Sequence, residues 1–352
     1  MRKGTLYGLS LVSFISAGIS HYLTGASTLT FIASGVAVGI LALFLGKATE
    51  DVAHYSGERI GAFISASFGN AAELIIAILL LREGLFDMLK ASITGSIMGN
   101  LLLVLGLSVL VGGMKYKEQT FNELLASHNA SLMLLAVIAL FVPAMFQNHM
   151  LQTKIETFSL IVAILLILVY FLWLFFSMHT HKHHLTSVQE AEEEEHHQPL
   201  WGKKQAIFML FFATILVAID SEWLVKSVEH VAHQFHLSNL FLGGFILALV
   251  GNAAEHFAAV LLARKNKMGA SVEIAVGSSV QIALFVTPLL ILIGYFINQE
   301  LSIIFTVPEL VAIGVSIFIA KSISKDGRTT WFEGLLLLLI YLLIGAGFYF
   351  IH

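Results

Sequence analysis

Long apolar runs separated by short polar segments dominate the pattern along this chain. An α-helix that crosses a bilayer needs about 20 mostly apolar residues, and eleven segments come close to that length or exceed it. The pattern therefore predicts an all-α integral membrane protein with eleven transmembrane helices. Their expected ranges are 5–23, 28–54, 60–81, 88–112, 124–144, 155–177, 205–231, 240–263, 270–296, 301–320 and 332–351.

The basic residues support this span count and give an orientation. Cytoplasmic loops of membrane proteins carry an excess of Lys and Arg. With the N-terminus in the cytoplasm, fifteen of the 19 basic residues fall on the inner side, and only Arg82, Lys90, Lys154 and Lys226 fall on the outer side. The first apolar run could also be a signal peptide, but no convincing small-residue cleavage site follows it, so we interpret it as a span.

Composition excludes several function classes. The chain is 57% hydrophobic and 12% charged, whereas soluble domains carry about 25% charged residues. A formal net charge of −4 gives no sign of nucleic-acid binding, and the absence of cysteine excludes disulfides, thiolate metal sites and cysteine catalysis. Because no long polar domain is present, we expect the function to lie within the membrane.

The chain contains an internal repeat. Gly-Asn-Ala-Ala-Glu occurs at 69–73 and again at 251–255, and Gly-Ser at 95–96 recurs at 277–278 with the same offset of 182 positions. Each half holds five spans, and an odd number makes the second half enter the membrane from the opposite side. This predicts an inverted-topology repeat, an architecture in which transporters place their sites near the midplane of the bilayer.

We therefore expect four parts along the chain. They are an extra N-terminal transmembrane helix (1–25), a first repeat (26–178), an acidic and histidine-rich cytoplasmic linker (179–200) and a second repeat (201–352). The linker carries four consecutive glutamates at 192–195 among several histidines. A solvated connection is the simplest interpretation, and a low-affinity cation antenna or a pH-sensitive regulator is the alternative.

Glu73 and Glu255 lie about halfway along their predicted spans. An ionised carboxylate at the bilayer centre costs on the order of 2.5–3.5 kcal/mol, so such residues usually have a function. Asn70 and Asn252 precede them by three positions, which places each pair on one helix face. The alternative is that each glutamate is neutral and hydrogen-bonded to a neighbouring helix.

Other residues of the repeat extend this candidate site. Further side-chain oxygens come from Ser96, Asn100, Ser278 and Gln281, and glycines expected to kink these helices or let them approach closely are Gly69, Gly251, Gly95 and Gly277. An all-oxygen set with two negative charges suits Ca²⁺, which takes 6–8 oxygen ligands. Two adjacent carboxylates in a low dielectric should also titrate as a coupled pair, so that protons compete with the metal.

A second matched acidic pair, Glu50 and Glu222, lies on the long second and seventh spans. We interpret the pair as part of a proton pathway or a gate, with an anchoring hydrogen bond as the alternative. Asp51 and Asp220 are expected nearer the helix ends. His256 follows Glu255 directly and points elsewhere on the helix, so packing or a proton relay is favoured over metal binding.

These motifs resemble the calcium/proton exchanger family. Residues 69–75 and 251–256 look like its two cation-binding repeats, and 95–101 and 277–285 resemble the continuation of each. The resemblance implies export of cytosolic Ca²⁺ against proton entry by alternating access, with spans 2 and 7 sliding against a core. It implies Glu73 and Glu255 as alternating Ca²⁺ and H⁺ ligands, near Asn70, Asn252, Ser278 and Gln281.

The expected setting is a bacterial cell membrane, because the chain lacks the long N-terminal extension of plant vacuolar members. Expected partners are Ca²⁺, H⁺ and the lipid bilayer; Ca²⁺ is the transported substrate, no cofactor is expected, and a homo-oligomer is left open. The alternatives are a sodium-coupled exchanger, whose usual Thr/Ser-rich motif with proline is absent, and a gated cation channel. No Ser/His/Asp arrangement supports an intramembrane hydrolase, so an enzyme is not expected.

Overall fold

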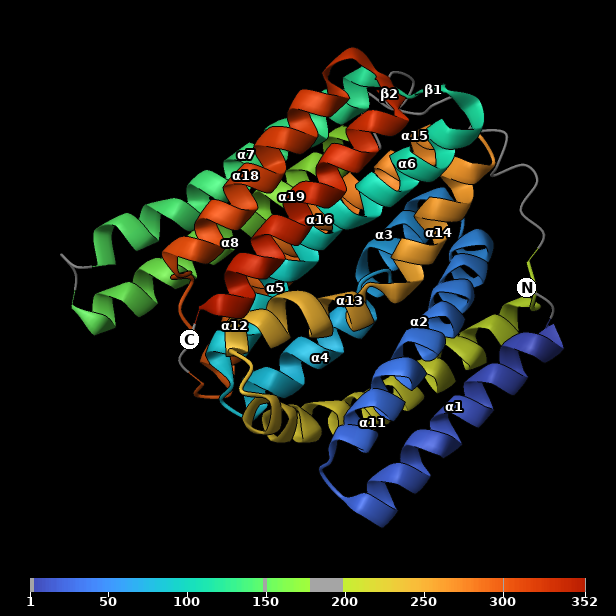
Figure 1. Ribbon diagram of the computed structural model, residues 1–352, viewed down its shortest axis with the longest axis vertical. Helices are drawn as coiled ribbons and strands as arrows, with labels where there is room; N and C mark the ends of the chain where they lie inside the picture. The colour runs from blue at the N-terminus through green and yellow to red at the C-terminus, as the bar shows by residue number, and fades with distance from the viewer. Residues whose placement is uncertain (1–2, 148–150, 178–198, 300, 352) are drawn as a thin grey trace. The chain divides into compact units, whose positions relative to one another are not determined.

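The computed structural model describes residues 3–147, 151–177, 199–299 and 301–351 of the chain, most of them helical (Figure 1). The chain separates into two compact units. The first comprises Met1–Ser92, His197–Ala254 and Ile351–His352, and the second comprises Ile93–His196 and Glu255–Phe350. Each unit takes segments from both halves of the sequence, so the compact units do not coincide with the two repeats predicted along the chain. The predicted linker lies outside the described residues except for its last two positions.

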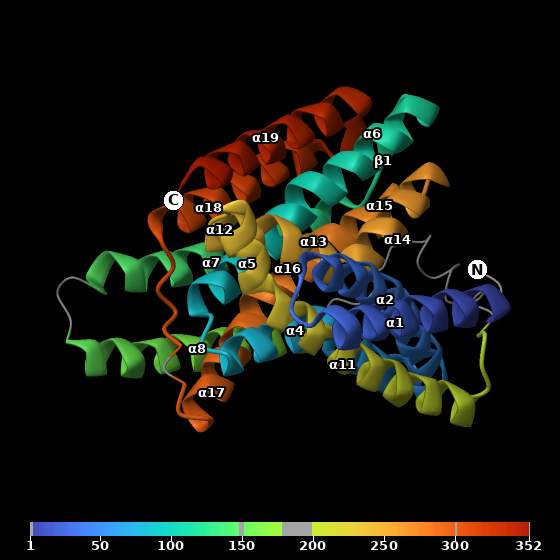
Figure 2. The same ribbon diagram turned by 60° about the horizontal axis from the view of Figure 1, so that its bottom comes forward.

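The first unit is built around three long helices. Helices α1 (Lys3–Thr24), α2 (Thr28–Ser56) and α11 (Lys203–Phe235) run side by side (Figures 1 and 2). The other elements of this unit are α3 (Glu58–Phe68), α4 (Ala71–Arg82), the beginning of α5 (Phe86–Met98), α12 (Asn239–Phe241), the π-helix η4 (Leu242–Leu247), α13 (Ala248–Gly251) and the start of α14 (Ala253–Arg264).

Two buried contacts fix α11 against α2. Leu41, Phe44 and Ala48 of α2 share a buried apolar cluster with Ala213 and Val217 of α11. Just before α11 begins, the backbone N–H of Trp201 donates a hydrogen bond of 2.8 Å to Oδ2 of Asp51, and both side chains are buried. A buried carboxylate needs such partners, so Asp51 ties the start of α11 to the end of α2.

The second unit contains the remaining helices and a short two-stranded sheet. Its elements are the end of α5, the π-helix η1 (Gly99–Val104), α6 (Leu105–Tyr116), β1 (Glu118–Thr120), α7 (Glu123–Phe146), α8 (Gln152–Phe175), most of α14, α15 (Met268–Val272), the π-helix η5 (Glu273–Gly277), α16 (Ser278–Gln281), the π-helix η6 (Ile282–Val286), α17 (Thr287–Phe296), α18 (Val307–Ile323), the 3₁₀-helix η7 (Ser324–Asp326), β2 (Arg328–Thr330) and α19 (Trp331–Phe350). The antiparallel strands β1 and β2 pair Glu118 with Thr330.

Glycines let α6 and α19 pack closely within the second unit. A Cβ atom added to Gly334 of α19 would lie 2.7 Å from the carbonyl oxygen of Gly106 on α6, and one added to Gly113 of α6 would lie 2.8 Å from Cα of Trp331. Those are backbone atoms and cannot turn away. Small residues of this kind allow close helix approach in membranes, where hydrophobic burial does not drive helices together.

The described residues contain nine helical segments that are long and apolar enough to cross a membrane. A tenth results if the pair Asn239–Gly251 and Ala253–Arg264, bent by 62°, is counted as one span. The predicted span 60–81 is interrupted, because α3 ends at Phe68 and α4 begins at Ala71. The chain is therefore a helical membrane protein with several spans, and the count of eleven stays a prediction.

Candidate cation site

Both repeated motifs interrupt a helix immediately before their glutamate. In the first motif α3 ends at Phe68 and α4 begins at Ala71, with Asn70 at φ −98° and ψ 29° between them. In the second, α13 ends at Gly251 and α14 begins at Ala253, with Asn252 at φ −87° and ψ 9°.

The break places each glutamate in the first turn of a new helix. Glu73 occupies this position in α4 and Glu255 occupies it in α14. The first turn of a helix exposes unbonded N–H groups and the positive end of the helix dipole. A carboxylate is stabilised there, which lowers the cost of holding a negative charge within a membrane span.

Asn70 and Asn252 are almost fully buried at these breaks, with exposed fractions of 2% and 1%. The side-chain amide nitrogen of Asn252 donates to the carbonyl oxygen of Ala248 at 2.8 Å. This bond holds the amide at the end of α13 and fixes the orientation of its oxygen, which is the atom that could bind a cation.

In the first unit, the second motif packs directly against the first. A Cβ atom added to Gly251 would lie 3.1 Å from Cγ of Glu73, and α4 contacts α13. Glycine at position 251 therefore leaves room for the Glu73 side chain. Two motifs that lie 182 positions apart in sequence thus meet beside one of the predicted acidic ligands.

In the second unit, Glu255 lies among other predicted ligands. Its carboxylate is hydrogen-bonded to the side chains of Ser278 and Asn100. Asn100 is fully buried at the start of η1, and Ser278, which begins α16, is 7% exposed. A structural glutamate would also have partners on neighbouring helices, but each of these two partners brings an oxygen that can coordinate a metal.

The other predicted ligands lie on the same two helical segments. Ser96 is buried in α5, three residues before η1 begins, and Gln281 is partly buried at the end of α16. Residue 95 lies within the uninterrupted α5, whereas Gly277 ends the π-helix η5. The helix breaks therefore occur next to Gly69 and Gly251, and not at Gly95.

Two π-helices occupy matching places in the two halves of the chain. Segment η1 covers Gly99–Val104, and η6 covers Ile282–Val286, which corresponds to positions 100–104 after the offset of 182 positions. The extra residue per turn shifts the side chains and carbonyl groups that follow it, and π-segments are frequent at functional sites. These two directly follow or include the predicted ligands Asn100 and Gln281.

The far end of α14 is fixed by contacts within the second unit. The amide nitrogen of buried Gln119 donates to the carbonyl oxygen of Ala263 and to Oδ1 of Asn266, both at 2.9 Å. Nζ of Lys115 donates to the carbonyl oxygen of Arg264 at 3.1 Å. These bonds satisfy terminal carbonyls that a helix leaves unpaired. They hold the C-terminal end of α14, the helix that carries Glu255 in its first turn.

The pair predicted for a proton pathway or gate lies on an exposed surface. The Glu50 side chain is 61% exposed and forms an ion pair of 2.8 Å with Lys47, and that of Glu222 is 48% exposed and pairs with Lys226 at 2.6 Å. A role in proton movement stays a prediction for both. His256 lies in the first turn of α14, and its Nε2 has no hydrogen-bond partner among the described residues.

The buried acids of these two helices are instead Asp51 and Asp220, and both are 0% exposed. The expectation that Asp220 lies near a helix end is wrong, because it occupies the middle of α11, beside Ser34 of α2. Sequence reasoning missed it because its neighbour Glu222 has a match in the first half and Asp220 has none. A charged residue within an otherwise apolar run was the available signal.

Among the residues that the structure describes, no group of three or more His, Cys, Asp or Glu side chains could hold a metal. Among these described residues, a cation site would combine fewer carboxylates with neutral oxygens, as the arrangement around Glu255 does. Hard cations such as Ca²⁺ accept side-chain amide, hydroxyl and carbonyl oxygens together with carboxylates.

Comparison with known proteins adds a family and close relatives. The family model described as "Sodium/calcium exchanger protein" matches residues 26–179 and 205–350. A protein from Aphanothece halophytica named Ca²⁺/H⁺ antiporter is 44% identical over 99% of this chain and 98% of its own length. A protein from Bacillus subtilis strain 168, named Ca²⁺/H⁺ antiporter ChaA, is 43% identical over 95% of this chain and 97% of its own.

A solved structure described as native YfkE has a similar fold. It superposes with a TM-score of 0.86 and 39% sequence identity, and the match covers 98% of this chain and 100% of that one. The similarity in fold therefore extends over nearly the full length of both chains.

Proposed function

This chain belongs to the sodium/calcium exchanger protein family, and from that premise we propose that it exchanges Ca²⁺ for H⁺ across a membrane. Relatives that match nearly all of the chain carry the name Ca²⁺/H⁺ antiporter, and they are transporters, not enzymes. A sodium-coupled exchanger and a gated channel are not favoured by these relatives. Ca²⁺ is the transported substrate.

The observation that carries the proposal is the local geometry that Glu73 and Glu255 share. Each lies in the first turn of a helix that begins after a break at an asparagine. Two carboxylates balance the charge of one Ca²⁺, and Asn70, Asn252, Ser96, Asn100, Ser278 and Gln281 add neutral oxygens. In this proposal the two glutamates face each other at the midplane, at the interface of two inverted repeats.

Exchange follows from the charge of this site. When the two glutamates hold one Ca²⁺, or when they hold protons, the site is neutral. The protein can then bury the site away from water, between the two faces of the membrane, at low cost. When it is empty it carries two negative charges, and moving it between the two faces is costly. Protons and Ca²⁺ therefore use the same oxygens in turn, while α2 and α11 slide against the remaining helices to expose the site on alternate sides.

The proposed setting is a bacterial cell membrane, with eleven spans and the N-terminus in the cytoplasm. The distribution of basic residues supports this orientation. The family match to residues 26–179 and 205–350 supports an arrangement of two related halves. In this orientation the protein exports cytosolic Ca²⁺ while protons enter.

The function is tested by the ion that drives uptake. Proteoliposomes with an acidic interior are diluted into Ca²⁺ at higher external pH, and uptake of radioactive Ca²⁺ is followed. We expect accumulation that a proton ionophore abolishes, and none when an outward Na⁺ gradient replaces the pH gradient. Uptake driven by Na⁺, or single-channel currents in planar bilayers, would contradict the proposal.

Replacing Gly251 with alanine should weaken Ca²⁺ binding about tenfold, on the order of 1.4 kcal/mol. The added methyl group would lie 3.1 Å from Cγ of Glu73, so that this side chain must shift by a few tenths of an ångström. The half-saturating Ca²⁺ concentration for uptake measures the effect. Gly46→Ala in α2 is the matched control, because no heavy atom of the described residues lies within 4 Å of its added Cβ. Equal behaviour of the two variants would refute the contact.

A further inference from the structure

Glu273 is an acidic residue inside a candidate membrane span, and the mechanism above does not use it. It begins η5 within the span Met268–Phe296, which follows the basic residues Arg264, Lys265 and Lys267. At about 1.5 Å per residue, Glu273 lies roughly 8 Å into the span and Ser278 roughly 15 Å. With the orientation proposed above, Glu273 is on the cytosolic side of the Glu255 site.

The Glu273 side chain lies along its own helix in the direction of that site. Its Oε1 would lie 3.3 Å from a Cβ atom added to Gly277, the residue just before Ser278. Its Oε2 accepts a hydrogen bond of 3.3 Å from Nδ2 of Asn129 on α7, which is 3% exposed. Glycine at 277 therefore gives the carboxylate space, and a buried amide from a second helix holds it there.

The helix that carries Glu273 contacts the helix that carries a ligand of the candidate site. Segment η5 packs against η1 and α7, and η1 includes Asn100, whose side chain is hydrogen-bonded to Glu255. Glu273 is therefore connected to Glu255 in two steps, through the packing of η5 against η1 and through the hydrogen bond between Asn100 of η1 and Glu255.

Glu273 also breaks the symmetry between the two halves. The position 182 residues earlier holds Ala91, and residues 91–95 lie in the regular α5, whereas 273–277 form a π-helix. Inverted halves present equivalent residues to opposite faces of the membrane. An acid found in only one half should therefore act at only one face.

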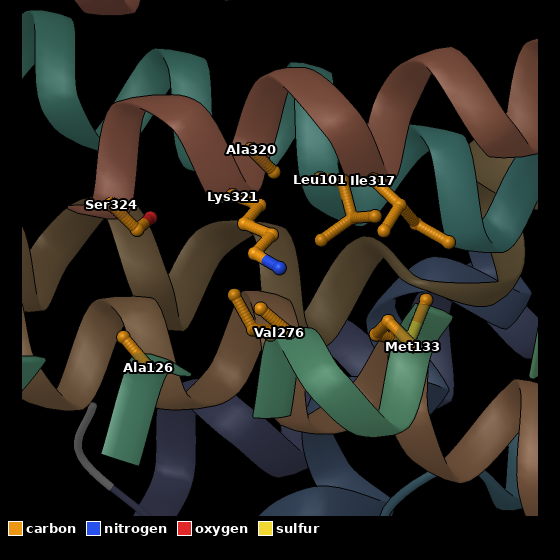
Figure 3. A pocket seen from close by; sticks show the side chains of 9 residues that line it. Leu101, Ala126, Met133, Val276, Ile317, Ala320, Lys321 and Ser324 are labelled. Carbon is orange, nitrogen blue, oxygen red and sulfur yellow. The ribbon is translucent and has the colours of Figure 1, made fainter. Parts of the chain in front are cut away.

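A neighbouring pocket offers a competing explanation for the negative charge of Glu273. A small open pocket lies among α7, α18, η1 and η5, with Val276 and Ala126 in its wall. Figure 3 shows the Lys321 side chain extending into it from α18. Glu273 could then serve only to balance the charge of Lys321 inside the protein, and an experiment must separate the two roles.

We propose that Glu273 is a cation-handling residue that binds Ca²⁺ transiently as it moves from the cytosol to Glu255, Asn100 and Ser278. The inference rests on the proposed function. A carboxylate on the way to the site raises the local Ca²⁺ concentration, and it replaces part of the hydration shell before the final ligands do so. Removing this carboxylate should therefore weaken Ca²⁺ binding from the cytosolic face and leave Ca²⁺ binding from the opposite face unchanged.

The test compares Ca²⁺ uptake at the two faces of the membrane. In everted vesicles, where the cytosolic face is outside, Glu273→Gln should raise the half-saturating Ca²⁺ concentration about fivefold at an unchanged maximum rate. In right-side-out vesicles that concentration should stay at the wild-type value. Asn129→Ala should give a smaller change of the same kind, and Glu273→Asp should behave nearly as the wild type does.

Lys321→Gln and the double variant decide between the two roles. If Glu273 only balances Lys321, Lys321→Gln alone should impair uptake, and combining it with Glu273→Gln should restore it. The proposal expects the double variant to keep the cytosolic-face defect. It is overturned by an unchanged Glu273→Gln, by an equal change at both faces, or by that restoration. Wild-type vesicles without proton-driven uptake would instead overturn the proposed function.

Discussion

Proton-driven Ca²⁺ uptake should fall at least about 100-fold when either Glu73 or Glu255 is replaced by glutamine. Glutamine keeps the size of the side chain, and at position 255 it can still bond to Ser278 and Asn100. It removes the charge, however, and losing one partner of a buried charged set costs about 3–5 kcal/mol, where 1.4 kcal/mol is a factor of ten. Uptake into proteoliposomes with an acidic interior is the measurement.

The control for this loss is Glu118→Gln in β1. Its carboxylate is 50% exposed and pairs with Arg328 at the surface, and exposed ion pairs contribute about 0–1 kcal/mol. It should therefore transport at nearly the wild-type rate. Binding of radioactive Ca²⁺ to purified protein separates lost binding from lost movement. Uptake by Glu255→Gln at the wild-type rate would show that this carboxylate is structural only.

Thermal stability should fall markedly when Gly334 of α19 is replaced by leucine. Any Cβ atom there would lie 2.7 Å from the carbonyl oxygen of Gly106, so α6 and α19 must separate. Overpacking typically costs 1–3 kcal/mol and sometimes more, and a clash with backbone belongs at the upper end, on the order of 3 kcal/mol. The melting temperature of the detergent-solubilised protein should drop by several degrees.

Gly347→Leu on the same helix is the matched control for that prediction. No heavy atom of the described residues comes within 4 Å of a Cβ atom added at Gly347. Both variants make the same chemical change in α19, so a difference between them reports the contact with α6. Equal melting temperatures would mean that α6 and α19 do not pack through Gly334.

Much of the architecture could be predicted because the bilayer constrains sequence so strongly. A membrane helix must satisfy its backbone internally and present apolar side chains to lipid, so runs such as 28–54 and 205–231 predicted α2 and α11 within a few residues. The duplicated Gly-Asn-Ala-Ala-Glu motif identified the candidate residues and the family, because carboxylates inside a span are rarely kept without a function.

Hydropathy and the repeated motif were thus enough to predict a helical membrane protein of the exchanger family and to name the residues of its candidate site. The burial of Asp220, the exposure of Glu222 and the approach of Gly251 to Glu73 became visible only in the folded chain. It alone brought Asn129 to Glu273 across 144 positions. The reason is physical: hydropathy is a property of each segment, whereas burial and contact depend on which neighbouring helix covers each face.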